Sequence, residues 1–350
     1  MIKRTRLKDV AERAGVAVNT ASMILNRRSN SWASKATEER VHQAAKELNY
    51  QPSRAAVALR LGKFNTIGLL VPDLQNPYFS RIAEMLEDEV AAKGYDLVIE
   101  STRLDPIREG KCLESIFERQ VDGVICFLLD NERHRDFLAD KFAQGKAIVA
   151  FGEADHKELP VDIISGNYIP GISQAIMMLA NLGHKRFAYL LAVAEGQAGG
   201  DRPDTFCKMM QKAGIPPENL LVVTTDSSIS GARAAAREVL AGSADRPTAI
   251  LAHNDLAALG VIRAAADLGL RVPADLSVVG VDNTLIGEHL PSALTTVGLP
   301  DALMVREATS LILKRLDNPT YAPLQKREFS SKLILRESTG LVPKPSWQTP

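Results

Sequence analysis

LKDVAERAGVAVNTASMILN, residues 7–26, is the stretch that decides the fold of the N-terminal part of the chain. Its first half has apolar residues at helical spacing: Leu7, Val10, Ala11 and Ala14. Gly15 then supplies the left-handed residue that ends a helix. A second apolar stripe follows at once: Val16, Thr20, Ala21 and Ile24 or Leu25. Two short helices joined by a Gly-containing turn are typical of a helix-turn-helix, and an ordinary pair of amphipathic helices is the alternative.

Several blocks of the chain resemble the signature of bacterial repressors of the lactose-repressor (LacI/GalR) family. Within the first stretch the blocks are Asp9-Val10-Ala11, Ala14-Gly15-Val16, Thr20-x-Ser22 and Leu25-Asn26. Further blocks keep the family's order: Glu47-Leu48-Asn49-Tyr50-x-Pro52, Thr66 to Asp73 with Asn76-Pro77-Tyr78-Phe79, Leu182-Gly183-His184, Asn254-Asp255, and Gly269 to Pro273 followed by Gly280-Val281-Asp282. The resemblance therefore extends along nearly the whole chain.

The resemblance implies a small all-α helix-turn-helix DNA-binding domain and an α/β two-lobed core like that of periplasmic binding proteins, with two parallel sheets and flanking helices. The expected parts are a headpiece at residues 1–50, a hinge helix at 51–63, and an effector-binding and dimerisation core at 64–350. Within the core we expect one lobe at about 64–183 and 298–328 and another at about 184–297 and 329–346. The chain would then cross between lobes near Gly183, Val297 and Phe329.

From Phe64 onward, short apolar runs alternate with amphipathic stretches, which predicts parallel sheets covered by helices. The expected strands are Thr66–Val71, Asp96–Ser101, Gly123–Phe127, Ala147–Phe151, Arg186–Leu191, Leu220–Thr224, Ala249–Ala252 and Leu276–Val281. The expected helices between them include Tyr78–Lys93, Gly171–Leu182, Ser230–Leu240 and Asp255–Leu268.

Composition predicts a soluble protein that stays in the cytoplasm, and the resemblance implies that this is a bacterial cytoplasm. No segment approaches the roughly 18 uninterrupted apolar residues of a membrane helix, and Lys3, Arg4 and Arg6 precede no apolar signal-peptide core. The three cysteines, Cys112, Cys126 and Cys207, are odd in number and far apart, which favours reduced thiols over a disulfide framework or a zinc site.

The formal charge of the whole chain is zero, but it is unevenly distributed. Residues 1–63 carry 13 Lys and Arg against 5 Asp and Glu, so this part has a net charge of +8 and the remaining 287 residues sum to −8. A basic head on an acidic body favours binding of DNA phosphates by the head. A solvated basic surface without a partner is the alternative.

The start of the second helix is the expected reading surface for DNA, because helix-turn-helix modules place these residues in the major groove. Asn19 suits adenine and Val18 suits a thymine methyl group. The resemblance adds further DNA contacts: Lys8, Thr20, Ser22, Met23, Asn26, Arg27 and Arg28. Met23 stands where the family usually has Arg, which puts the preferred operator sequence in doubt.

Two of the expected helix ends lack the family's usual hydroxyl cap. Arg6 and Ala17 occupy those positions, and we expect Thr5 to cap the first helix one residue early. Ser34 is the expected N-cap of a third helix. After Pro52, the stretch SRAAVALRL resembles the family's hinge helix, in which Ser53, Ala56 and Leu59 would meet the minor groove; a plain linker helix is the alternative.

The expected effector site follows from parallel-sheet geometry, since ligands bind beyond the carboxyl ends of strands. Acidic and amide side chains there can hold hydroxyl groups of a sugar or a related metabolite. Combined with the family register, the candidate effector residues are Asp73, Asn76, Phe79, Asn167, Arg202, Asp226, Asn254 and Asp282. Turns and helix caps are the alternative role of each Asp and Asn.

The predicted function is that of an effector-controlled, sequence-specific DNA-binding regulator, most simply a repressor that binds a near-palindromic operator as a homodimer. We expect no enzymatic activity, cofactor or metal site, because the chain lacks a nucleophile elbow, a phosphate-binding loop and metal-ligand spacing. His184 fits a Leu-Gly-His turn. The alternative function is a solute-binding protein for a small polar ligand without a role in gene regulation.

Overall fold

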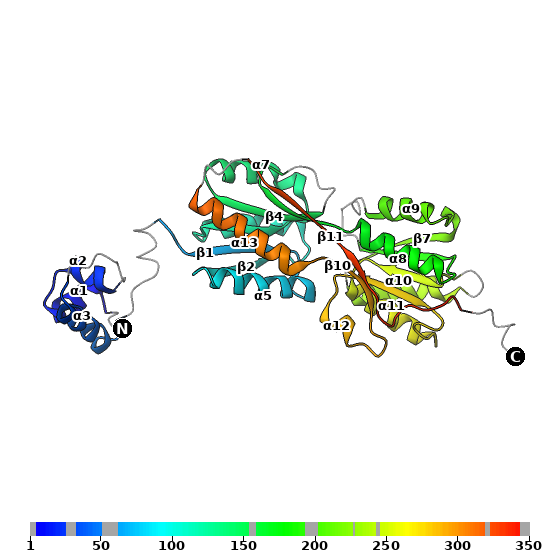
Figure 1. The fold of residues 1–350 in the computed structure, drawn as a ribbon, viewed down its shortest axis with the longest axis horizontal. Helices are drawn as coiled ribbons and strands as arrows, with labels where there is room; N and C mark the ends of the chain where they lie inside the picture. The colour runs from blue at the N-terminus through cyan, green and yellow to red at the C-terminus, as the bar shows by residue number, and fades with distance from the viewer. Residues whose placement is uncertain are drawn as a thin grey trace. The chain divides into compact units, whose positions relative to one another are not determined.

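The computed structural model describes residues 5–25, 33–50, 62–153, 159–192, 202–226, 228–242, 246–318 and 323–343. The chain divides into two compact units, Met1–Asn65 and Thr66–Pro350, and each has its own hydrophobic core (Figure 1). Among the described residues, no helix combines the length and the apolar composition needed to cross a bilayer.

The first unit, the headpiece, contains three helices: α1 (Leu7–Ala14), α2 (Val18–Leu25) and α3 (Lys35–Glu47). Gly15 has a φ of 68° and ends α1, as expected from the sequence. The amide of Val16 then donates to the Ala11 carbonyl at 3.0 Å, which closes the tight turn into α2. The three helices share a core of small and branched residues that includes Val10, Ala21 and Val41. The helix-turn-helix prediction is confirmed.

One of the two cap predictions for the headpiece is confirmed and the other is wrong. Ser34 accepts a hydrogen bond from the amide of Thr37 at 3.3 Å and caps α3. Thr5 does not cap α1, because its hydroxyl donates instead to the Leu48 carbonyl at 3.0 Å. The start of α1 is closed by Asp9, whose carboxylate accepts from the Arg6 amide at 2.8 Å.

The second unit, the core, contains two six-stranded sheets. Its strands are β1 (Thr66–Val71), β2 (Asp96–Ser101), β3 (Gly123–Phe127), β4 (Ala147–Glu153), β5 (Asp162–Asn167), β6 (Phe187–Ala192), β7 (Leu220–Thr225), β8 (Ala249–Ala252), β9 (Ser277–Val281), β10 (Thr295–Gly298), β11 (Lys326–Ser330) and β12 (Lys332–Ile334). Its helices are α5 (Pro77–Ala91), α6 (Pro106–Glu118), α7 (Asn131–Ala143), α8 (Ile169–Asn181), α9 (Arg202–Lys212), α10 (Ile229–Ala241), α11 (Asp255–Asp267), α12 (Leu285–Glu288) and α13 (Asp301–Asp317), with a 3-10 turn at Pro217–Asn219. All eight expected strands are present within two residues of their predicted ends.

The first sheet has the order β11-β5-β4-β3-β1-β2 with every pairing parallel. Helices α5 and α13 cover one face, where Ile82 and Leu311 are buried together. Helices α6 and α7 cover the other face through Leu113 and Leu138. A sheet covered by helices on both faces is what the alternating pattern predicts.

The second sheet has the order β12-β10-β9-β8-β6-β7. Ile176 of α8 and Phe206 of α9 are buried on one face, and Ala236 of α10 and Val261 of α11 on the other. The edge strand β12 runs antiparallel to β10, so this sheet is mixed rather than purely parallel. The direction of β12 follows from β11, because β12 continues the same run of chain with only Ser331 between them, whereas α13 and β11 separate it from β10.

The first crossing between the sheets differs from the expected one. Helix α8 packs on the second sheet, so the chain leaves the first sheet after Asn167 rather than near Gly183. The other crossings lie between Gly298 and Asp301 and at Ser331, where β11 passes directly into β12 (Figure 1).

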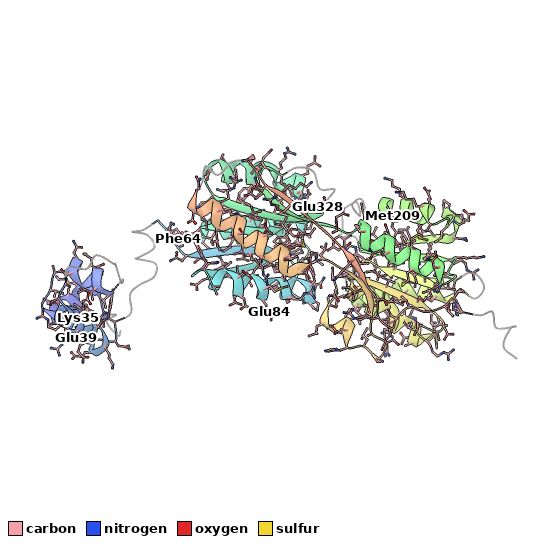
Figure 2. The ribbon with its side chains drawn as sticks, viewed as in Figure 1. Lys35, Glu39, Phe64, Glu84, Met209 and Glu328 are labelled. Carbon is pink, nitrogen blue, oxygen red and sulfur yellow. The ribbon has the colours of Figure 1, made fainter. Side chains whose placement is uncertain are left out.

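The first and third crossings are hydrogen-bonded to each other, and the second packs against them through Val297 and Leu299. The amide of Ser331 donates to the Asn167 carbonyl at 2.9 Å, and the Ser331 hydroxyl accepts from the Gly171 amide at 3.1 Å. The side chain of Asn167 also donates to Glu328 at 3.0 Å, and Glu328 lies on β11, the edge strand of the first sheet (Figure 2). A Cβ atom on Gly171 would collide with Val297 and Ser331, so this junction needs a glycine.

We expect Gly171→Ala to lower the stability of the core by about 1–3 kcal/mol, the usual cost of overpacking a tight contact. Its urea unfolding midpoint should fall in the full-length chain. Gly242→Ala is the matched control, because an added Cβ there meets nothing within 4 Å. Equal midpoints for the two variants would show that the crossings tolerate extra volume.

Candidate DNA-reading surface and effector site

The start of α2 presents the side chains best placed to reach DNA bases. Val18, with 43% of its surface exposed, and Asn19 stand clear of the headpiece core. Thr20 and Met23 are half-buried, whereas Ser22 is buried in the isolated headpiece. The surface therefore offers one amide and one branched apolar side chain for direct base contacts.

Of the remaining residues predicted to contact DNA, only Lys8 lies in the described part of the chain. Lys8, near the start of α1, is exposed and suits a phosphate contact. The other predicted contacts lie outside the described residues: Asn26, Arg27, Arg28, Ser53, Ala56 and Leu59.

An ion pair fixes the helices that support this surface. Arg13 on α1 donates through Nε and Nη2 to one carboxylate oxygen of Glu47 on α3, at 3.0 and 2.7 Å. Hydrogen bonds from Gln43 and Arg13 lower the pKa of Glu47, because both favour the charged carboxylate. The pair ties the first and third helices while leaving α2 free to face DNA.

In the core, the predicted effector residues after β1 are already engaged locally. Asp73 accepts from the Gln75 amide at 2.9 Å in a turn, and Asn76 caps α5 by accepting from the Tyr78 amide at 3.0 Å. Phe79 packs edge-on against Phe127, with 5.4 Å between ring centroids. These residues shape the end of the first sheet, and their turn and cap roles are those expected of Asp and Asn.

The predicted residues of the second lobe also have local partners. Asn254 caps α11 through a 2.8 Å bond from the Ala257 amide. Asp226 accepts from the amide and hydroxyl of Ser228 at 2.9 and 2.6 Å. Asn167 accepts from the Ile169 amide at 3.1 Å at the first crossing. Arg202 begins α9, and its side chain lies outside the described residues.

Asp282, the remaining predicted effector residue, lies in a turn of unusual backbone conformation. It follows β9 with a φ of 103°, and Asn283 follows with a φ of 51°, so two consecutive residues with side chains adopt left-handed backbone. Such conformations are rare for non-glycine residues and persist only where surrounding contacts hold them.

Asp255, which follows β8 beside Asn254, supplies much of that support. Its buried carboxylate accepts from the amide and hydroxyl of Thr284 at 2.6 and 2.9 Å and from the hydroxyl of Thr296 at 2.6 Å. Burial raises the pKa of Asp255, whereas these hydrogen bonds act in the opposite direction. Asp255 is therefore a structural brace for the turn that carries Asp282.

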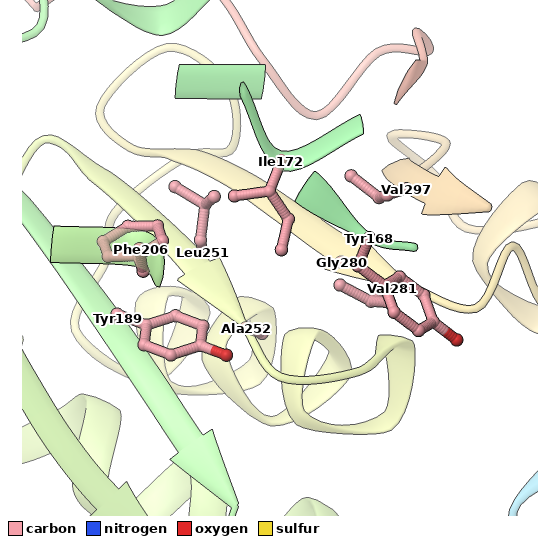
Figure 3. Close-up of a pocket in the computed structure, with 9 residues that line it drawn as sticks. All are labelled: Tyr168, Ile172, Tyr189, Phe206, Leu251, Ala252, Gly280, Val281 and Val297. Carbon is pink, nitrogen blue, oxygen red and sulfur yellow. The ribbon is translucent and has the colours of Figure 1, made fainter. Parts of the chain in front are cut away.

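A small pocket opens beside this turn (Figure 3). Its cavity volume is about 10 Å³, roughly the room that one water molecule takes. The rings of Tyr189 and Phe206 stack with 4.5 Å between centroids and 13° between planes. The lining residues are Tyr168, Ile172, Tyr189, Phe206, Leu251, Ala252, Gly280, Val281 and Val297. This wall offers apolar and aromatic faces with few polar groups, as small-molecule sites do.

The environment of His184 is structural. His184 is buried between the Thr248 hydroxyl at 2.9 Å and the Gly340 carbonyl at 3.0 Å, which is the structural role predicted for it. Burial lowers its pKa. In the described part of the chain, no three His, Cys, Asp or Glu side chains are arranged to hold a metal ion.

The chain is similar to known regulators over almost its entire length. Residues 6–53 match the lacI family of bacterial regulatory proteins, and residues 176–339 match the periplasmic binding protein-like domain. The chain is 33% identical to the HTH-type transcriptional regulator DegA of Bacillus subtilis (strain 168) over 338 residues, 96% of this chain and 98% of DegA. The chain belongs to the LacI family.

Other relatives agree with this membership. The HTH-type transcriptional repressor PurR of Proteus mirabilis (strain HI4320) is 32% identical over 95% of this chain and 96% of PurR. The lac repressor dimer bound to operator and the anti-inducer ONPF superposes with a TM-score of 0.83 at 26% identity, covering 97% of this chain and all of that one. The complex of the regulator CelR with cellobiose gives 0.68 at 28% identity, over 96% of this chain and all of CelR. The LacI-family chain is thus a DNA-binding transcriptional regulator and not an enzyme.

Asp301, at the start of α13 beside the candidate effector site, gives a pH prediction. Burial raises its pKa from 3.8 to about 6, against the opposing effect of Arg81. Because the folded-state pKa is raised, ionisation costs stability: the contribution of Asp301 falls as pH rises from about 4 to about 6 and is constant above that range.

We expect Asp301→Asn to remove this dependence. The variant's stability relative to the parent should rise by up to about 3 kcal/mol between pH 4 and pH 6 and then level off. Urea unfolding of both proteins at half-unit pH steps measures the difference. A difference that stays constant with pH would contradict the raised pKa.

Proposed function

We propose that this chain represses transcription as a homodimer in the bacterial cytoplasm, by binding a near-palindromic operator through two headpieces under the control of a small molecule bound in the core. The main support is a headpiece with an exposed start of α2 joined to a two-sheet core, the combination found in the operator-bound lac repressor dimer. The basic headpiece, with its net charge of +8 over residues 1–63, suits a DNA partner.

Exposed apolar residues at the edge of the first sheet support pairing of two copies. Ile99 lies on the edge strand β2 and is 39% exposed, and Ile107 at the start of the neighbouring α6 is 70% exposed. Apolar side chains on an unpaired sheet edge favour association with another chain. A symmetric dimer also matches a palindromic site, because each half-site then meets an identical headpiece.

The effector we propose is a sugar or a related small metabolite. The aromatic wall formed by Tyr168, Tyr189 and Phe206 can pack against the face of a ring, and the carboxylate of Asp282 can accept hydrogen bonds from hydroxyl or amine groups. Effector-bound relatives, such as CelR with cellobiose, support this class of ligand.

Selection of bound sequences from a random DNA pool tests the proposed function. We expect the recovered sequences to be near-palindromic and their affinity to fall steeply with salt, because phosphate contacts release counterions. Asn19→Ala should weaken binding by about 1–3 kcal/mol and relax the preference at one base position. His42→Ala on the exposed surface of α3 is the control and should bind as the parent does. Affinity that is independent of salt and sequence would refute the proposal.

A metabolite panel screened by thermal unfolding tests the effector site, since a ligand that binds only the folded state raises the unfolding temperature. For any sugar or related compound that stabilises the parent, Asp282→Ala should weaken binding at least tenfold in calorimetry, the scale of one charge-assisted hydrogen bond. Asp275→Ala removes a carboxylate that pairs with exposed Arg271 at 2.9 Å and serves as the control. Equal affinity of Asp282→Ala and the parent would remove Asp282 from the site.

A further inference from the structure

Arg81 connects the two lobes at the turn that carries Asp282. It projects from α5 on the first sheet and donates through Nη2 to the carbonyl of Asp282 at 2.8 Å and through Nη1 to the carbonyl of Asn283 at 2.5 Å. Both acceptors belong to the segment after β9 of the second sheet. A single guanidinium thus binds two consecutive carbonyls across the lobe boundary.

These carbonyls belong to the two residues with left-handed backbone. The second lobe holds the rest of the turn: Asp282 donates its amide to Val297 at 2.9 Å, Asn283 accepts from Arg336 at 2.7 Å through its side-chain oxygen, and Thr284 is held by Asp255. The hydrogen bonds from Arg81 restrain the same turn from the opposite lobe.

Arg81 is itself fixed within the first lobe before it reaches the turn. Its Nη2 also binds the carboxylate of Asp301 on α13 at 2.5 Å, and its guanidinium lies 5.8 Å from the ring centroid of Tyr78. The planar guanidinium fork, oriented by these two groups, suits a pair of adjacent oxygen acceptors better than a lysine ammonium would.

We propose that Arg81 is a positioning residue for effector recognition: it holds the Asp282–Asn283 turn in its left-handed form and makes that hold depend on closure of the two lobes. This inference rests on the proposed function, because Asp282 matters here as an effector contact. When the lobes move about the three crossings, the bonds between Arg81 and the turn must break, so the shape of the site and the relative position of the lobes change together.

Hydrogen exchange of the full-length chain without ligand tests the positioning role. In Arg81→Met, we expect a peptide covering residues 281–287 to exchange at least tenfold faster than in the parent, while peptides from β3 exchange as before. Arg81→Lys keeps the charge but lacks the fork, so it should restore only part of the protection. It also serves as the second variant if Arg81→Met folds poorly. Unchanged exchange of residues 281–287 in Arg81→Met would overturn the proposal.

Arg306→Met is the matched control, because Arg306 also joins α13 to α5, through an exposed pair with Glu89 at 3.4 Å. It should leave exchange of residues 281–287 at the parent rate. If it accelerates this exchange as much as Arg81→Met does, general loosening of the helix pair explains the effect and the proposal fails.

Spin labels at Lys93→Cys and Glu218→Cys, in a Cys207→Ser background, test the dependence on lobe closure. Both positions are exposed, and they lie in different lobes. Distances should lengthen or broaden in Arg81→Met and not in Arg306→Met; identical distributions would remove the link to lobe closure. DNA selection with the parent is independent of these measurements, so failure of the proposed function can be recognised separately.

Discussion

The close packing of the three chain crossings is the constraint on which the two-lobed core depends. Ser331, Gly171 and Asn167 are joined by hydrogen bonds at this junction, and Gly171 has no room for a side chain beside Val297. Because interiors are close-packed, such a junction cannot stretch gradually. Motion between the lobes must therefore occur as rotation about these few residues. A ligand bound between the ends of the strands can then influence the lobes only through this rotation.

The candidate effector site is built largely from groups that first serve the fold. Asn76 and Asn254 cap the helices that follow β1 and β8, and Asp255 braces the turn after β9. This overlap is physical rather than accidental, because the carboxyl end of a parallel strand adjoins the N-terminus of the next helix, where unpaired amides need acceptors. The same side chain types therefore suit both a helix cap and a hydroxylated ligand.

Much of the fold could be predicted from local pattern, and the failures have identifiable causes. Strands such as TIGLLV at 66–71 are continuous apolar runs typical of buried parallel strands. The edge strands β11 and β12, KREFS and KLI, are short, charged and largely exposed, so their pairing depends on tertiary structure. The position predicted for the first crossing is wrong because α8 is apolar over a broad face. Its sequence does not show which of the two sheets it covers.

The candidate site was predicted less completely than the fold. Asp282 could be found from its place after a buried strand, and Val18 and Asn19 from their place at the start of α2. Arg81 could not, because one arginine on an amphipathic helix is the ordinary pattern of a solvated face. Tyr168, Tyr189 and Phe206 are far apart in the sequence, and no local period reveals that they share one pocket.

A buried ion pair anchors the start of β11, the strand that leads to the third crossing. Asp162 at the start of β5 is fully buried and binds Arg315 of α13 through two bonds of 2.7 and 2.8 Å. Asp162 also accepts from the Gln325 amide at 2.8 Å, directly before β11. Removing one partner of such a pair would leave an uncompensated buried charge, so β11 is anchored where it enters the first sheet. Since β12 begins two residues after β11 ends, little chain is left to absorb motion, and rotation between the lobes is confined to the residues around Ser331.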